Sequence, residues 1–553
     1  MSEEATPKPR SVTAGGVPAW VARGVVALAA ILTALLHVPL QVLPIARDQG
    51  TWLTAAMALA HGKVFYRDYL HFNLPATAFA YRLAWLFVSD PRHVTVLLSA
   101  INSMLIVLTI YLLLSETMSR AAGAWGALAF GLLWPIQLGW WGIAQKDFLT
   151  IPWLFAATWL AARAGPGRRL RRVSLVAAGV CAAAAMQFKP SYGLLGLLLA
   201  VGLFLRRAGT LRASWKQLLA DLAFFAAGGV LGFAPLLIYL AVHQAFADAW
   251  FCLVDFGGKY FGEHNISRKA LARKFFITQV GLDRDFAFGI GWWLVCLAGI
   301  AVWLASLRRK LRWWLAAPAL VAGTSFFIQR KGFGYHMDPW FATLCLFGGV
   351  TLALTCRLGK LWPPRRRSLI WLALAVVFLF PLGKTAHHSL TKKQYARAVV
   401  PTWRGDMTRH RFLTRYFKQN GDHAAPELSE KLAAWLRANT RPDETILIWG
   451  HESQIYVLAD RMYATQAPYD QCLSTFVPQH EPPQMTEEKR RFLRLLDVDR
   501  PKYIFVMTRD RNPVETLSPD QSIVRVPGFK EYLDTHYTQL PNYDRLLLFQ
   551  RNP

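Results

Sequence analysis

A carboxylate beside an arginine stands just past the end of the first apolar segment, in the tetrad Arg47-Asp48-Gln49-Gly50. Ionisable groups at membrane depth cost free energy to place there, and those that occur generally serve chemistry or transport. A half-buried carboxylate can accept a proton from a hydroxyl group as a general base. We therefore expect chemistry at Asp48, with simple pairing to Arg47 or a helix-capping role as the alternative.

A second carboxylate and several cations also stand at the ends of apolar segments. They are Asp147, Lys189 and, within the stretch 329–336, Arg330, Lys331, Tyr335 and His336. Cations held beside a leaving phosphate would stabilise the charge that develops on it. The alternatives are an N-cap role for Asp147, an interfacial position for Lys189 and a structural role for His336.

The elements that must position these residues are apolar segments long enough to cross a bilayer. The chain has 553 residues, of which 54% are hydrophobic and 22 are Trp, and its mean hydropathy is +0.24. Such a composition is typical of a polytopic α-helical membrane protein. We expect about 11 transmembrane helices near 24–44, 92–114, 120–138, 147–164, 173–188, 190–206, 218–242, 286–306, 313–328, 338–356 and 368–384.

The distribution of positive charge predicts the orientation of these segments. Lys and Arg total 62 against 34 Asp and Glu, a net charge of +28. The strong clusters, near 168–172, 206–216, 308–312 and 357–367, each follow an even-numbered segment. The positive-inside rule then places the tail 1–23 in the cytoplasm and the C-terminal tail outside. This pattern indicates membrane topology, and we expect no nucleic-acid partner.

The predicted membrane domain covers 24–384 and carries an outer loop at 46–91, while residues 385–553 change to α/β character. In the loop, the apolar spacing from Trp52 to Ala60 indicates a helix along the membrane surface. In the tail, 426–439 is predicted to be an amphipathic helix, and 445–449, 503–507 and 546–549 are predicted strands. The six cysteines show no disulfide framework and no zinc spacing.

On these residues the chain resembles the GT-C class of membrane glycosyltransferases. It is most similar to bacterial polyprenol-phosphate-sugar transferases of the protein O-mannosyltransferase and aminoarabinose transferase families. The matching residues are the tetrad 47–50, then Gly62, Tyr66-Arg67-Asp68-Tyr69 and Pro75, then Asp147, and the turn Gln329–His336. The resemblance covers roughly residues 1–385, with a trailing outer domain as in many members.

The resemblance implies an inverting transfer of a sugar from a polyprenyl-phosphate donor to a lipid, glycan or protein acceptor. The enzyme would work at the outer face of the bacterial cytoplasmic membrane, among membrane lipids. Asp48 would be the catalytic base, and Arg47, Tyr66, Asp147, Lys189, Arg330, Lys331, Tyr335 and His336 would bind substrate. A divalent cation at Asp48 and Asp147 stays open.

The chain also departs from the family pattern. Asn73-Leu74-Pro75-Ala76 replaces the Asn-Lys-Pro-Pro stretch of the aminoarabinose branch, so an aminoarabinose substrate does not follow. Gln49 stands where several relatives carry Glu. A membrane transporter or flippase for a lipid-linked or anionic substrate, a phosphoethanolamine-type transferase and a non-catalytic assembly subunit remain the alternatives.

Overall fold

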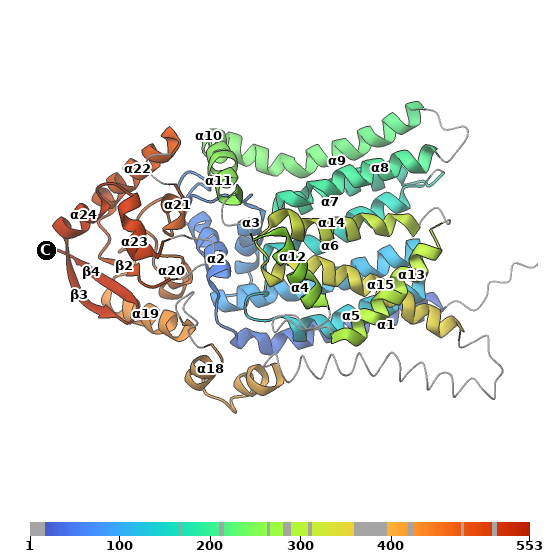
Figure 1. Cartoon of the computed structure of the whole chain (residues 1–553), viewed down its shortest axis with the longest axis horizontal. Helices are drawn as coiled ribbons and strands as arrows, with labels where there is room; N and C mark the ends of the chain where they lie inside the picture. Colours follow the sequence, from blue (N-terminus) through green and yellow to red (C-terminus); the bar gives the residue numbers. More distant parts are fainter. Residues whose placement is uncertain are drawn as a thin grey trace, which may run out of the picture.

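The computed structural model of the chain is predominantly helical, with a small sheet near the C-terminus (Figure 1). It describes residues 17–165, 167–208, 215–262, 266–279, 289–307, 312–358, 395–417, 425–476, 481–510 and 517–553. The predicted segment 368–384 lies outside these residues.

Long apolar helices form a bundle at one end of the molecule (Figure 1). They are α1 (Ala19–His37), α4 (Pro91–Thr117), α5 (Arg120–Gln137), α6 (Lys146–Arg163), α7 (Arg171–Phe188), α8 (Gly193–Ala208), α9 (Trp215–Val242), α13 (Gly289–Ala305), α14 (Ala316–Gln329) and α15 (Asp338–Leu358). Each coincides with a predicted segment. Among the described residues, four helices are long and apolar enough by themselves to cross a membrane: Ala19–Val42, Pro91–Thr117, Trp215–Val242 and Gly334–Leu358.

A buried aromatic stack helps to hold the bundle together beside the predicted site. The rings of Phe130 and Trp134 on α5 stack at 5.5 Å, and Trp134 stacks on Phe148 of α6 at 5.4 Å. Stacked aromatic rings contribute contact energy beyond the area that they bury. Because Phe148 follows Asp147 directly, this stack fixes the start of α6.

Shorter elements lie between the bundle and the C-terminal sheet (Figure 1). They are η1 (Val38–Val42), α2 (Arg47–Ala60), α3 (Ala76–Trp85), η2 (Pro190–Tyr192), α10 (Phe246–Trp250), η3 (Phe251–Phe256), α11 (Gly257–Gly262) and η5 (Gly334–Met337). Two further short elements, α12 (Arg268–Gln279) and η4 (Arg312–Leu315), lie against the bundle. The helix predicted in the first loop exists as α2, but its position differs from the prediction of a surface helix. Eleven of its 14 residues are buried, because α2 lies between α3 and the C-terminal domain.

The C-terminal sheet has four strands in the order β1-β2-β4-β3. β1 (Ile446–Trp449) pairs parallel with β2 (Tyr503–Met507), and β4 (Leu546–Arg551) pairs antiparallel with both β2 and β3 (Tyr537–Tyr543). A parallel pair needs a crossover, and here it contains α20 (Gln454–Ala459), α21 (Gln471–Ser474) and α22 (Pro483–Asp499). The remaining helices are α19 (Pro426–Asn439), α23 (Pro519–Ser522), η9 (Ile523–Arg525) and α24 (Phe529–His536). The predicted strands and the amphipathic helix 426–439 are thus confirmed.

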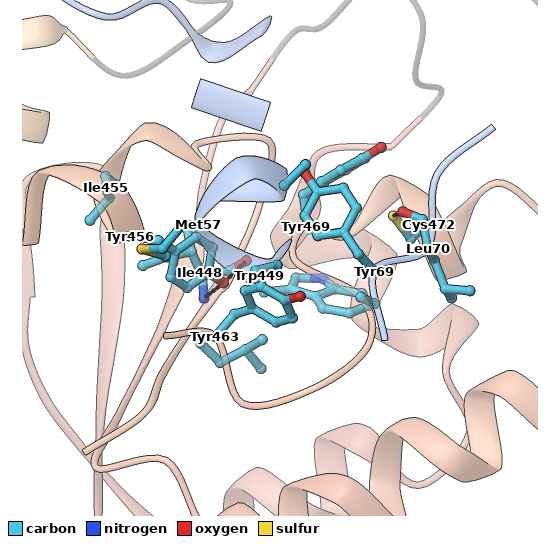
Figure 2. Close-up of a cluster of buried hydrophobic side chains, with 14 of the residues drawn as sticks. Met57, Tyr69, Leu70, Ile448, Trp449, Ile455, Tyr456, Tyr463, Tyr469 and Cys472 are labelled. Carbon is cyan, nitrogen blue, oxygen red and sulfur yellow. Dashed lines mark hydrogen bonds between the residues drawn. The ribbon is translucent and has the colours of Figure 1, made fainter. Parts of the chain in front are cut away.

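The first loop and the C-terminal sheet share one hydrophobic core. Figure 2 shows Tyr69 and Leu70 of the loop beside Trp449, Tyr469 and Cys472 of the C-terminal domain. All five side chains are at most 1% exposed. The loop is therefore packed inside the molecule between two domains.

The segment 395–417 packs differently from the sheet that follows it. It forms η7 (Tyr395–Val399), α17 (Val400–Trp403) and α18 (Arg409–Tyr416). Its buried residues, among them Tyr395 and Phe412, belong to the hydrophobic core of the bundle. The chain thus stays against the bundle until the C-terminal domain begins at α19.

Candidate active site

Asp48 lies in the first turn of α2, at the boundary between the bundle and the C-terminal domain. A carboxylate is favoured there by the partial positive charge of a helix N-terminus. Gly50 fixes the position of this turn, because a Cβ atom at residue 50 would come within 2.4 Å of the backbone nitrogen of Gln454. Asp48 itself is half-buried, and its Oδ2 accepts a hydrogen bond from Nε2 of Gln145 at 3.0 Å. A partly exposed carboxylate that is held by a neutral amide is accessible to a substrate hydroxyl group.

The start of α6 supplies the second predicted carboxylate. Asp147 is fully buried, and its Oδ1 forms an ion pair with Nζ of Lys189, which follows the end of α7. Oδ2 of Asp147 is buried and has no hydrogen-bond partner among the described residues. The structure thus brings Asp147 and Lys189 together, and it leaves one carboxylate oxygen for a further donor.

Lys146, the first residue of α6, brings another cation to the same place. Its Nζ donates to Oδ1 of Asn73 at 2.7 Å, and no carboxylate of the described residues pairs with it. A positive charge at a helix N-terminus is disfavoured by the helix dipole. The charges of Asp147 and Asp48 act on Lys146, but neither carboxylate forms an ion pair with it in the described residues, so its ammonium group is suited to bind an anion.

The turn after α14 carries Arg330 and Lys331. Arg330 adopts a left-handed backbone conformation with φ 51°, and its carbonyl oxygen accepts from the backbone nitrogen of Ile266 at 3.0 Å. Nζ of Lys331 donates to the carbonyl oxygen of Tyr260 at 3.1 Å and lies 4.9 Å from the centre of its ring. The loop before α12 and helix α11 therefore hold this turn in place.

Tyr335 and His336 connect the turn to the two carboxylates. The side chain of Tyr335 interacts with Asp48 through a hydrogen bond. His336 is 4% exposed, and the charges that act on it are those of Lys189, Lys146, Lys274 and Lys331. Its Nδ1 is buried without a hydrogen-bond partner in the described part of the chain. The site thus joins a carboxylate, a phenol, an imidazole and several lysines, a set suited to proton transfer beside a bound anion.

Two of the predicted substrate-binding residues make structural contacts. Arg47 donates to Oε1 of Glu452 at 2.6 Å and to Oδ2 of Asp510 at 3.1 Å, so its guanidinium group joins α2 to the C-terminal domain. The hydroxyl group of Tyr66 donates to the carbonyl oxygen of Asn73 at 3.1 Å. Substrate roles for Arg47 and Tyr66 stay predictions.

Sequence reasoning left Lys146, Gln145 and Asn73 out of the site. A signal for Lys146 was available, because a lysine that opens a helix opposes the helix dipole and needs a reason to be there. Gln145 and Asn73 carry no local signal. Their partners are 97 and 73 residues away in the chain.

The carboxylates of this site offer a poor ligand set for a divalent cation. No group of three or more His, Cys, Asp and Glu residues that could hold a metal ion occurs among the described residues. Ca²⁺ takes six to eight oxygen ligands, whereas Mg²⁺ keeps several waters and needs only one or two carboxylates, and Asp147 is already paired with Lys189. A cation at Asp48 and Asp147 remains a prediction.

Comparison of the whole chain with solved structures gives matches that cover nearly all of it. ArnT from Cupriavidus metallidurans, solved bound to undecaprenyl phosphate, matches with TM-score 0.59 and 12% identity over 96% of this chain and 97% of that chain. The Archaeoglobus fulgidus oligosaccharyltransferase matches with TM-score 0.56 and 13% identity over 97% and 75%. The mycobacterial arabinofuranosyltransferase AftD matches with TM-score 0.53 and 14% identity over 98% of this chain but 40% of that chain.

No family model and no curated protein matches the sequence. At 12–14% identity the structural likeness concerns the fold. The resemblance inferred from the tetrad and the two acidic positions is thereby confirmed at the level of architecture. The chain has the polytopic GT-C fold of membrane glycosyltransferases.

Proposed function

We propose that this protein is an inverting glycosyltransferase that moves a sugar from a polyprenyl-phosphate donor to an acceptor hydroxyl group. The observation that carries the proposal is the convergence of a half-buried carboxylate, Asp48, with the ammonium group of Lys146, on which the charge of Asp48 acts, and with the Asp147–Lys189 pair. These groups are what the two halves of the reaction need, a base for the acceptor and positive charge for the phosphate.

In the proposed reaction the acceptor oxygen attacks C1 of the sugar as the bond between C1 and the phosphate oxygen breaks. Asp48 receives the proton of the hydroxyl group, and the polyprenyl phosphate leaves with the electron pair. Tyr335 holds the carboxylate of Asp48 through its side chain. Lys146, with Lys189 and Lys331 nearby, stabilises the negative charge on the leaving phosphate.

The lipid phosphates bound in two of the matched structures support the donor class. ArnT was solved with undecaprenyl phosphate, and the archaeal oligosaccharyltransferase AglB with an inhibitory peptide and a dolichol-phosphate. Both place a lipid phosphate on the fold that this chain shares. We extend this to a lipid, glycan or protein acceptor at the outer face of the bacterial cytoplasmic membrane, with the C-terminal domain on that side.

The test is turnover by purified protein in nanodiscs, with a panel of radiolabelled polyprenyl-phosphate sugars. We expect wild-type protein to consume one donor class and Asp48→Asn to lose turnover by a factor of about 10³ or more, since a base that sits at the reacting proton has no substitute. Asp68→Asn, which changes a carboxylate paired with Arg491, is the matched control and should retain turnover.

Two other outcomes would redirect the interpretation. Donor binding without consumption by folded wild-type protein would favour a transporter or a non-catalytic subunit. Full turnover by Asp48→Asn would remove Asp48 as the base while leaving the transferase class in place.

A further inference from the structure

A chain of hydrogen bonds runs from Lys146 in the site to the C-terminal domain. Nζ of Lys146 bonds Oδ1 of Asn73 at 2.7 Å, Nδ2 of Asn73 bonds Nε2 of His71 at 3.4 Å, and Nδ1 of His71 bonds the hydroxyl group of Tyr469 at 2.8 Å. Asn73, His71 and Tyr469 are 3%, 4% and 1% exposed. These hydrogen bonds are therefore shielded from water everywhere beyond Lys146.

The chemistry of lysine fixes the direction of every bond in this chain. A lysine ammonium group has only donors, so the amide of Asn73 must turn its oxygen to Lys146 and its NH₂ group to His71. Nε2 of His71 must then accept, and Nδ1 must carry the proton that is donated to Tyr469. Each member has one orientation that satisfies its neighbours.

The far end of the chain is also closed. The side chains of Tyr469 and Cys472 are hydrogen-bonded to each other. Sγ of Cys472 donates to the carbonyl oxygen of Leu70 at 3.2 Å, and Figure 2 shows these two residues side by side. The hydroxyl hydrogen of Tyr469 thus has an acceptor in Cys472, and the chain ends on the backbone of the same loop that carries His71.

The surroundings of His71 keep its imidazole ring neutral. Burial lowers the pKa of His71 well below its usual range, and the positive charges of Lys146 and His451 lower the pKa further. The rings of Trp52, Tyr69 and Phe72 lie 4.6, 6.1 and 5.1 Å from that of His71. A neutral, packed histidine holds one tautomer. The hydrogen bonds from Asn73 and to Tyr469 require such a fixed tautomer, with the proton on Nδ1.

We propose that Tyr469 and His71 are positioning residues for Lys146, through which the C-terminal domain sets the affinity of the site for the phosphate of a lipid donor. The inference rests on the proposed function, in which Lys146 binds that phosphate. A free lysine side chain has many rotamers, and ordering it on binding costs free energy. Here Asn73, oriented by His71 and Tyr469, orders the ammonium group before the phosphate arrives.

The test is the dissociation constant for undecaprenyl phosphate, measured with the full chain in nanodiscs. Tyr469→Phe should raise the Kd about tenfold, equivalent to about 1.4 kcal/mol. The matched control is Tyr463→Phe. Tyr463 is also buried, and its hydroxyl group donates to the carbonyl oxygen of Asp68 at 2.9 Å, so it joins the same domain to the same loop without touching the chain. It should change the Kd by less than about twofold.

A double-mutant cycle separates positioning from general loosening of the domain. If Tyr469 acts through Lys146, then adding Tyr469→Phe to Lys146→Met should cause no further rise in Kd. Additive effects would overturn the inference, as would equal effects of Tyr469→Phe and Tyr463→Phe. Failure of wild-type protein to bind undecaprenyl phosphate would instead overturn the proposed donor, and this inference with it.

A second variant covers the case in which Tyr469→Phe does not fold. Asn73→Asp keeps the size of the side chain but gives Lys146 a carboxylate partner, which compensates its charge. We expect a rise in Kd of about tenfold or more, because the phosphate must then compete with an ion pair. An unchanged Kd would overturn the inference.

Discussion

The two ends of the helix bundle carry similar charges in different settings. At the end away from the C-terminal domain, three arginines have defined partners: Arg168 pairs with Glu116, Arg171 pairs with Asp221, and Arg206 donates to the carbonyl oxygens of Ala161 and Ala162. At the domain-side end, the ammonium group of Lys146 bonds only a neutral amide oxygen among the described residues.

α6 connects these two settings. Its 18 residues begin at Lys146 and end at Arg163, so its ends are about 27 Å apart at 1.5 Å per residue. Cations at the C-terminal end of a helix are favoured by the dipole, whereas cations at the N-terminal end are disfavoured. Arg163 thus lies at the favoured end of α6, whereas Lys146 lies at the disfavoured end and is held there against a cost that ligand binding explains.

The largest effect is expected from breaking the buried pair at the domain-side end. Lys189→Met removes the ion-pair partner of the buried Asp147, which should destabilise the protein by about 3–5 kcal/mol and lower turnover per folded molecule by about 100-fold. Thermal unfolding and donor consumption in the same nanodisc sample measure both effects.

Arg171→Met is the counterpart at the other end and sharpens the comparison. The side chain of Arg171 is 21% exposed, so the loss of stability should be smaller, about 1–2 kcal/mol. Turnover per folded molecule should be unchanged. A loss of turnover in Arg171→Met that matches Lys189→Met would contradict the division of roles between the two ends.

A smaller effect is expected at Tyr335. Tyr335→Phe removes the hydroxyl group that interacts with Asp48, and we expect kcat to fall about tenfold, as for the loss of one hydrogen bond to a charged group. Tyr416→Phe is the control. The hydroxyl group of Tyr416 donates to the carbonyl oxygen of Arg397, and neither residue belongs to the candidate site. Equal kcat values for Tyr335→Phe and wild type would remove Tyr335 from the reaction.

The stability of the docked C-terminal domain should depend on pH through His71. Burial lowers the pKa of His71 in the folded protein, so the unfolded chain binds a proton near pH 6.5 that the folded chain excludes. Stability is therefore complete above about pH 6.5 and falls as the pH decreases below it. The midpoint of thermal unfolding should drop between pH 7 and pH 5, and His71→Gln should reduce the drop; an identical drop in the variant would exclude His71 as its source.

Chelation should have the smallest effect. The described charges suited to neutralise a phosphate belong to lysines and to Arg330, so we expect a chelator to leave donor consumption within about twofold of its untreated value. If chelation abolished donor consumption and a divalent cation restored it, a metal would be assigned to Asp48 and Asp147. That metal would then share with the lysines the neutralisation of the phosphate.

Local sequence features predicted much of this structure. Apolar length predicted the bundle helices, and periodicity predicted α19 and the strands β1, β2 and β4. Asp48, Asp147 and the turn 329–336 could be singled out because charge beside an apolar segment is costly wherever it occurs.

Long-range contacts could not be predicted in the same way. The Arg47–Glu452 pair joins residues 405 positions apart, and the His71–Tyr469 bond joins residues 398 positions apart. Hydrophobic spacing indicates which face of a helix is buried but not what covers it. For this reason α2 was predicted on the membrane surface, whereas it is buried beneath the C-terminal domain.

A titration of undecaprenyl phosphate against Lys146→Met and Arg168→Met, beside wild-type protein in nanodiscs, tests the comparison most directly. Each variant removes one positive charge, from the domain-side end or from the opposite end. We predict a rise in Kd of about 30-fold for Lys146→Met and less than about twofold for Arg168→Met. Equal Kd values for the two variants would contradict a phosphate site at Lys146. The domain-side lysines would then have no role in binding the donor.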